Sequence, residues 1–182
     1  MSRIPTLETE AAPEASKPLL EGVNKQLGAV PNMFRILANS SDVLGGHLAL
    51  SGALNGGKLD AATREKIALA VAEINGCDYC LSAHSYIGKA FKLLDDAEIE
   101  AARHGSSKDA KAEAALALAI ELVKNRGKVG DGQISAAKLA GHSDSEILEI
   151  IAHVAVNTFT NYVNSALDTE IDFPRLETRA AA

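Results

Sequence analysis

Residues 65–85, "EKIALAVAEINGCDYCLSAHS", combine two helical segments with a glycine between them. Apolar residues recur at helical spacing up to Gly76, a residue type that commonly ends helices. A second helix is predicted to begin near Cys77, so the two helices can pack side by side. Helical periodicity with similar breakers continues from Leu19 onward, and no convincing strand pattern interrupts it. The sequence therefore predicts an all-α fold of about eight packed antiparallel helices.

The chain ends differ from this helical body. Residues 1–18 hold three prolines and several acidic residues, which favours a flexible N-terminal arm. Residues 19–174 are predicted to form a single domain, since 182 residues suffice for one substantial core. Residues 175–182 are predicted to be a C-terminal tail.

Composition excludes several classes of protein. The chain is 47% hydrophobic but only 4% aromatic, with no Trp, so its core must consist mostly of Ala, Leu, Ile and Val. A net charge of −6 argues against nucleic acid as a partner. No apolar run reaches the ~18 residues of a membrane span, and the N-terminus lacks the apolar region of a secretory signal. We therefore expect no membrane partner and a cytoplasmic location.

The two cysteines of the chain are the main candidates for chemistry. Cys77, Cys80 and His84 stand at i, i+3 and i+7, which is one stripe on a helix. The positive end of the helix dipole favours a thiolate near the first turn. An imidazole one turn away can accept a thiol proton, and the paired sulfurs can close a disulfide. In a cytoplasmic chain this pattern predicts a redox-active dithiol.

A histidine that acts as a base usually needs an orienting partner. The preceding helix offers Glu65, twelve residues before Cys77, and Glu73, four residues before it. Spacing alone does not choose between the two carboxylates, and Glu65 could equally be a first-turn residue that balances the helix dipole.

The cysteine pair also fits two other interpretations. Cys77, Cys80, His84 and Glu65 would make four plausible zinc ligands in a binding module without catalysis. Structural zinc more often uses two separated pairs, and the chain has no second pair. The cysteines could also be small buried hydrophobes. We expect neither a metal nor a cofactor.

Other polar residues are expected to have structural roles rather than catalytic ones. Histidines without a partner at metal spacing are expected on the surface or packed in the core: His47, His104 and His153. Three asparagines at roughly helical spacing were expected on a subunit contact or a solvated face: Asn157, Asn161 and Asn164.

The pattern Glu65-x11-Cys77-x2-Cys80-x3-His84 resembles the alkyl hydroperoxidase D-like (AhpD-like), CxxC-containing branch of the carboxymuconolactone decarboxylase superfamily. The flanks "LGAVPNMFRILANS" (27–40) and "NTFTNYVNSALDTEIDFP" (157–174) also look like that family. The resemblance covers about residues 19–174. It implies an all-helical homo-oligomer, a trimer or hexamer. The decarboxylase branch lacks this cysteine pair, so decarboxylation is not expected.

The resemblance also implies an activity, that of a thiol-dependent peroxidase. Carried over by position, Cys80 is the thiolate that attacks peroxide and Cys77 the resolving thiol, while Glu65 and His84 relay a proton. An external dithiol of the lipoyl or thioredoxin type would restore the pair. One departure is Tyr79, which stands where the best-known peroxidase of the family has a histidine. This departure favours an alternative, a dithiol–disulfide adaptor that reduces a partner peroxidase.

Overall fold

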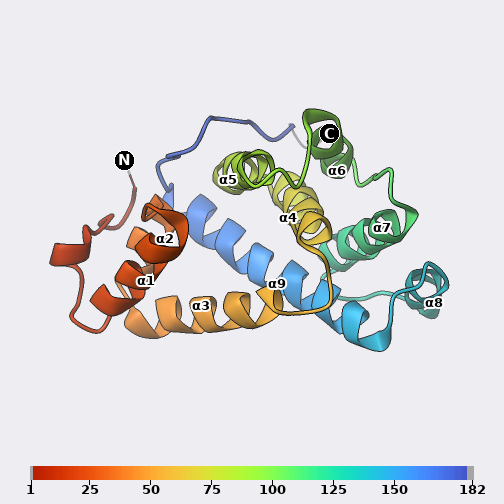
Figure 1. Ribbon diagram of the computed structural model, residues 1–182, viewed down its shortest axis with the longest axis horizontal. Helices are drawn as coiled ribbons and strands as arrows, with labels where there is room; N and C mark the ends of the chain where they lie inside the picture. Colours follow the sequence, from red (N-terminus) through yellow and green to blue (C-terminus); the bar gives the residue numbers. More distant parts are fainter. Residues whose placement is uncertain (1, 180–182) are drawn as a thin grey trace.

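The computed structural model describes residues 2–179, and this part contains nine α-helices, one short 3-10 helix and no strand (Figure 1). The predicted all-α class is confirmed, and the helices number one more than the eight expected. Their bounds are η1 Thr9–Ala11, α1 Lys17–Leu27, α2 Asn32–Leu37, α3 Ser41–Asn55, α4 Ala61–Asn75, α5 Asp78–Ala90, α6 Asp96–Arg103, α7 Ala110–Lys124, α8 Asp131–Leu139 and α9 Asp144–Leu167.

Helix α4 lies at the centre of the larger core. It contacts α5, α6, α7 and α9, and the run from Ile67 to Ala72 is buried on every side. Three of these six residues are alanine, which lets neighbouring helices approach closely. A helix that is apolar all round is a core helix, so α4 gives a rigid base to the residues at its ends.

The turn between α4 and α5 forms as the sequence predicts. Gly76 takes the left-handed conformation with φ 68°, and the Cys77 amide donates to the Ala72 carbonyl at 3.0 Å. This pairing is a glycine C-cap of the Schellman type. Cys77 is the N-cap of α5, one position before the first turn in which we expected it, and its Sγ accepts a hydrogen bond from the Cys80 amide at 3.3 Å.

The N-terminal helices form a second, smaller cluster with α3. Helix α1 begins at Lys17, two residues before the predicted domain start, and Pro18 is tolerated there because the first turn needs no amide donor. Ser16 is buried and donates to the Ala38 carbonyl at 2.8 Å. Residues 2–16 therefore contact the helices, and the flexibility of the arm stays a prediction.

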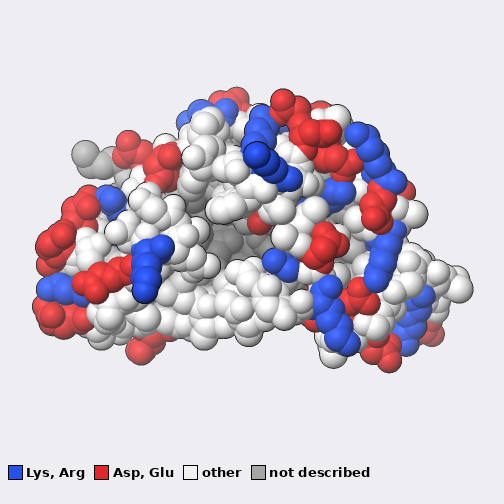
Figure 2. Space-filling model, viewed as in Figure 1, with Lys and Arg blue, Asp and Glu red and all other residues white. Residues whose placement is uncertain are grey.

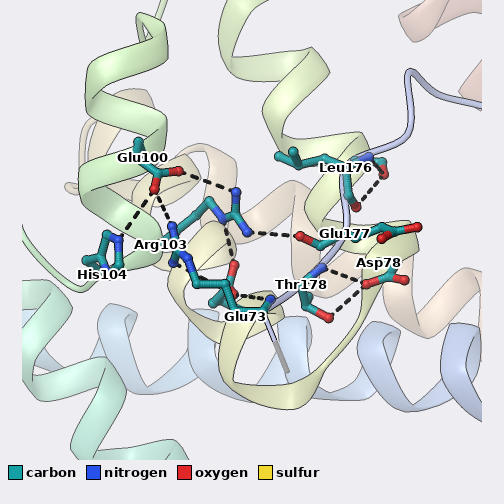
Figure 3. A network of polar contacts seen from close by, with 10 residues as sticks. Glu73, Asp78, Glu100, Arg103, His104, Leu176, Glu177 and Thr178 are labelled. Atoms are coloured by element: carbon teal, nitrogen blue, oxygen red, sulfur yellow. Dashed lines mark hydrogen bonds and ion pairs between the residues drawn. The ribbon is translucent and has the colours of Figure 1, made fainter. Parts of the chain in front are cut away.

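The C-terminal strap, residues 169–179, is not helical and follows α5 back toward α4 (Figure 3). The Leu176 amide donates to Ser82 Oγ at 2.9 Å, and Thr178 donates to Asp78 Oδ1 through both its amide and its hydroxyl at 2.8 Å. The strap thus fixes one side of α5. The rest of the predicted tail, residues 180–182, lies outside the described residues.

Helix α9, the longest element at 24 residues, runs along both clusters and contacts α3, α4, α5 and α7. Its inner face is buried along its length. Within residues 2–179, no helix combines the length and the apolar character needed to cross a membrane.

Candidate active site

A cavity of about 650 Å³ opens between the N-terminal helices and the α4–α5 hairpin. Figure 2 shows the hollow in the middle of this face, with a rim formed mainly by uncharged side chains. Its walls are largely apolar and include Met33, Phe34, Leu48, Ile87, Phe91 and Phe173. Its polar lining includes Glu65, Cys80, His84 and His153. The cavity therefore brings three of the four predicted site residues to one surface.

Glu65 and His84 form a hydrogen-bonded ion pair between α4 and α5. His84 Nδ1 lies 2.8 Å from Glu65 Oε2, and both side chains are largely buried. Burial by itself would lower the pKa of His84. The Glu65 carboxylate, and to a smaller extent Cys80, outweigh that effect and raise the pKa above its usual value. His84 is therefore held in a form that can carry a proton.

Glu73 is the other carboxylate that sequence spacing allowed as the partner of His84, but in the structure it has a different partner. Its Oε2 lies 2.6 Å from Arg103 Nε, and its Oε1 accepts a hydrogen bond from the Arg179 amide at 2.7 Å (Figure 3). Glu73 thus joins α4 to α6 and to the C-terminal strap. Glu65 is the residue of the two that contacts His84.

The two cysteines are free thiols, each only 2% exposed, but they differ in position. Cys80 lines the cavity, whereas Cys77 is behind it. Burial favours a neutral Cys80, but hydrogen bonds from Cys77 and Asn164 and the charge of His84 lower its pKa to about 6. The hydrogen bond with Cys80 and then burial raise the pKa of Cys77. The thiolate is therefore favoured at Cys80 rather than at Cys77, the N-cap of α5.

The sequence interpretation missed the role of two asparagines on α9. Asn164 Nδ2 donates to Cys80 Sγ at 3.3 Å, and Asn161 is buried beside it. The expectation of a solvated face is therefore wrong. One signal could have placed them: Asn157, Asn161 and Asn164 continue the stripe of Ile150 and Val154, which are buried. Polar residues on such a stripe face the core.

Two histidines expected only to pack or to face solvent also line the cavity. His153 is buried on α9, and His47 is partly buried between the rings of Phe34 and Phe159. Burial lowers the pKa of both imidazoles, so they are neutral near pH 7. In the described part of the chain, His153 Nε2 and His47 Nδ1 have no hydrogen-bond partner. The cavity thus offers unused polar atoms within apolar walls.

Tyr79 lies beside Cys80 on the cavity wall. Its hydroxyl accepts a hydrogen bond from the Met33 amide at 3.1 Å, and its ring meets Phe173 edge to face. Burial raises the pKa of the phenol, so Tyr79 is not a base at neutral pH. It joins α5 to α2 and to the strap instead.

No metal-binding arrangement is formed by these side chains. Over the described range, no group of three or more His, Cys, Asp or Glu residues is placed to hold an ion.

The chain is similar to a known protein family over part of its length. Residues 46–121 match the model of the carboxymuconolactone decarboxylase family. The matched segment includes Glu65, Cys77, Cys80 and His84. A search of curated proteins found no match.

Solved structures share the fold over nearly the whole chain. One is the alkylhydroperoxidase AhpD core of an uncharacterized peroxidase-related protein from Ralstonia eutropha JMP134, with a TM-score of 0.84 and 24% identity over 94% of this chain and 92% of that chain. Another is an uncharacterized peroxidase-related protein from Silicibacter sp. TM1040, with a TM-score of 0.80 and 24% identity over 93% and 91% of the two chains.

A third similar structure comes from an enzyme of different activity. It is a cysteine-to-alanine variant of the debrominase Bmp8 in complex with 2,3,4-tribromopyrrole, with a TM-score of 0.78 and 23% identity over 92% of this chain and 90% of that chain. The fold is therefore shared by proteins with more than one activity. This chain has the AhpD-like fold, and its residues 46–121, which match the carboxymuconolactone decarboxylase family model, contain the CxxC pair Cys77–Cys80.

Proposed function

We propose that the protein is a thiol-dependent peroxidase in which Cys80 attacks the peroxide. The observation that carries the proposal is the position of Cys80 on the cavity wall, with a pKa lowered to about 6 and the Glu65–His84 pair beside it. A thiolate, not a thiol, is the nucleophile in such chemistry, and a Cys80 pKa of about 6 favours the thiolate at pH 7.

The first step transfers one oxygen atom to sulfur. The Cys80 thiolate attacks the terminal oxygen of the hydroperoxide, an S–O bond forms as the O–O bond breaks, Cys80 becomes a sulfenic acid, and an alkoxide is the leaving group. The alkoxide takes a proton from the His84 imidazolium and departs as the alcohol. Because the Glu65 carboxylate raises the pKa of His84, the proton is present when the thiolate forms, and Glu65 then helps to replace it.

The second step closes the disulfide. The Cys77 sulfur attacks the Cys80 sulfenic acid, the S–O bond breaks, and the oxygen leaves as water. Cys77 keeps its proton until this step, because its hydrogen bond with Cys80 and its burial raise its pKa. An external dithiol then reduces the disulfide and regenerates both thiols.

The cavity favours an organic hydroperoxide over hydrogen peroxide. A volume of about 650 Å³ is in the range of pockets that hold drug-sized ligands, and its walls are largely apolar. Hydrogen peroxide would contact only a small part of this surface. We therefore expect the specificity constant for a bulky substrate such as cumene hydroperoxide to exceed that for hydrogen peroxide.

The direct test is the Cys80→Ser variant, assayed for cumene hydroperoxide turnover with dihydrolipoamide as reductant. Turnover should be lost in C80S, while C77S in the absence of the dithiol should consume one equivalent of peroxide per chain and then stop. Undiminished turnover in C80S would exclude Cys80 as the nucleophile. Turnover in the unchanged chain with a thioredoxin but not with dihydrolipoamide would assign the reductant class.

A dithiol–disulfide adaptor would use Cys77 and Cys80 to reduce a disulfide in a partner protein. Both cysteine residues are only 2% exposed, so a partner peroxidase, like a thioredoxin-type reductant, can reach the sulfurs only if the surrounding helices or strap move. This burial favours a small substrate over a protein substrate. Competition between cumene hydroperoxide and a disulfide-bonded partner peroxidase for the reduced chain separates the two activities.

Reductive dehalogenation is a second candidate, favoured by the similarity to the debrominase and by the apolar cavity that ends at Cys80. In that reaction Cys80 would take the halogen from an aromatic ring, the carbon would gain a proton, and Cys77 would displace halide to leave a disulfide. Bromide release from 2,3,4-tribromopyrrole with a dithiol measures it. If bromide is released faster than peroxide is turned over, dehalogenation is the main activity of the protein.

We also propose that copies of the chain associate through the outer face of α9. Leu148 and Tyr162 are 67% and 64% exposed there, with Ile151 and Phe159 between them. Residues 150–167 contain no Lys, Arg, Asp or Glu, which is unusual for a solvent-facing helix. Sedimentation velocity should give a trimer or hexamer, and the double variant L148D/Y162D should give a smaller particle. A monomeric unchanged chain would contradict the proposal.

A further inference from the structure

The Cys80 sulfur has two buried amide side chains on the side away from the cavity. Asn164 Nδ2 donates to Cys80 Sγ at 3.3 Å, and Asn164 is only 3% exposed. Asn161, one turn earlier on α9, is 1% exposed. Cys80 lines the cavity, whereas neither asparagine does. The amides therefore reach the sulfur from behind and leave its cavity side open to a substrate.

A third asparagine fixes the orientation of Asn161. Asn75, the last residue of α4, donates from Nδ2 to Asn161 Oδ1 at 2.8 Å. That bond occupies the acceptor of Asn161 and leaves its Nδ2 as a buried donor. Between residues 2 and 179, this Nδ2 has no hydrogen-bond partner. A buried donor without an acceptor is costly to the fold, so an anion beside it is stabilised.

We propose that Asn161 and Asn164 form an amide cradle that holds the Cys80 sulfur as a thiolate and directs it toward the cavity. The proposal rests on the proposed function, which makes Cys80 the nucleophile. Both amides are neutral donors, and hydrogen bonds from neutral donors to an ion are among the stronger ones in proteins. Unlike His84, an amide keeps its protons at every pH of interest, so the cradle acts whether or not the imidazole is charged.

The ionisable neighbours of the sulfur do not replace this cradle. They are Cys77 at the N-cap of α5, Tyr79 and His84 on α5 itself, and Glu65 of α4, which acts through His84. Burial raises the pKa of Cys80, and the hydrogen bonds from Cys77 and Asn164, the nearby Asn161 amide and the His84 charge together reverse that effect. Two of these four contributions come from α9, where no carboxylate or cation touches the sulfur.

The test is a titration of the thiolate by its absorbance at 240 nm in the reduced full-length chain. The unchanged protein should show an inflection at about pH 6 that is absent in C80S. In Asn164→Leu, which has a similar volume but no donor, this inflection should move toward the ordinary thiol value of about 8.5. Asn164→Asp, which also lacks the amide donors, should move it in the same direction and serves if the leucine variant does not fold.

Thr169→Val is the matched control. Thr169 is buried just after α9, and its hydroxyl makes no hydrogen bond within the described residues. This variant removes a buried polar atom near Asn164 without removing a donor to sulfur, so the inflection should stay at about pH 6. Far-UV circular dichroism of each variant checks that the helices remain.

Peroxide turnover adds a second readout. At pH 6 the rate in N164L should fall roughly fivefold or more, because the thiolate fraction falls from about one half to below about one tenth. At pH 9 it should return to that of the unchanged chain, since a more basic thiolate is also more nucleophilic. An unmoved inflection in a folded variant, or an equal loss at both pH values, overturns the cradle. If the inflection moves in N164L but the unchanged chain shows no peroxide turnover, the cradle is supported and only the peroxidase function is rejected.

Discussion

His84 Nδ1 lies 2.8 Å from Glu65 Oε2, although the two residues are 19 positions apart and stand on different helices. Gly76 makes this contact possible, because its left-handed conformation reverses the chain between α4 and α5. The carboxylate raises the pKa of the imidazole, and the charged imidazole in turn lowers the pKa of Cys80. The same ion pair thus provides the acid that protonates the leaving alkoxide and also favours the thiolate form of the nucleophile.

Glu65→Gln tests this coupling. The amide keeps the shape of the carboxylate but removes its charge, so the pKa of His84 should fall and that of Cys80 should rise. We expect peroxide turnover at pH 7 to drop by roughly 10²-fold, the usual scale of positioned acid–base catalysis. Steady-state kinetics with saturating dithiol measures the effect.

Glu73→Gln is the control for this variant, because Glu73 is on the same helix but pairs with Arg103. It should lower the melting temperature and leave the turnover of the folded chain unchanged. Equal losses of turnover in both variants would show that α4 matters only for stability.

The pH dependence of turnover follows from the same two groups. As pH rises through about 6, Cys80 ionises and kcat/KM for the hydroperoxide should increase. As pH rises further, past the raised pKa of His84, the imidazolium is lost and kcat/KM should decrease. The profile should therefore be bell-shaped. In His84→Asn the falling limb should vanish and the rising limb should move to higher pH. A single rise near pH 8.5 in the unchanged chain would indicate an ordinary thiol.

The Glu73–Arg103 ion pair should matter for stability rather than for chemistry. Both side chains are about 10% exposed, at 10% and 9%, and Arg103 also donates to the Glu177 carbonyl of the strap. Arg103→Leu removes the nearer of the two guanidinium groups beside this buried carboxylate, since Arg179 stays 3.8 Å from Glu73 Oε1. Breaking a buried pair typically costs about 3–5 kcal/mol, which sets the upper end of the expected loss. Urea unfolding measures the free energy. Arg175→Leu is the matched control: Arg175 is exposed and lies 3.8 Å from Asp78, so about 1 kcal/mol or less is expected.

The cavity should determine the preference among peroxides. Ser51 lines it from α3 and is partly buried, so Ser51→Phe should fill space that a bulky substrate needs. The KM for cumene hydroperoxide should rise roughly tenfold, on the scale of a few lost apolar contacts, while kinetics with hydrogen peroxide stay unchanged. Ala49→Phe changes an exposed neighbour outside the lining and should affect neither substrate. An equal rise for both peroxides in S51F would mean that the cavity is not the substrate site.

Local sequence patterns predicted the parts of the site that lie within one helix or one turn. The stop at Gly76 and the stripe of Cys77, Cys80 and His84 follow from helical periodicity, so they did not need the tertiary structure. Even there the boundary was off by one residue: Cys77 caps α5 instead of opening its first turn. Helix ends depend on which atom caps them, and a cysteine sulfur is an uncommon cap.

Contacts between distant segments were beyond the sequence patterns. Spacing did not separate Glu65 from Glu73, and the relay role came to Glu65 only through the family resemblance. In the structure Glu65 contacts His84 on α5, whereas Glu73 pairs with Arg103 on α6. The asparagines of α9 were misinterpreted because their residue type suggested solvent. Their partners, Asn75 and Cys80, are more than eighty positions away in sequence. Helix packing determines which residue of another helix contacts the site, and helical periodicity within one segment does not predict that contact.

The most direct measurement of the proposed chemistry is a single turnover without reductant. The fully reduced chain is mixed with excess cumene hydroperoxide and analysed by intact mass and peptide mapping. One alcohol should form per chain, and the mass should fall by two hydrogens through a Cys77–Cys80 disulfide. In C77S the peptide with Cys80 should instead gain one oxygen. Alcohol formation without a change in either cysteine, or an oxygen on Cys77 with Cys80 untouched, would contradict Cys80 as the peroxide-reducing thiolate.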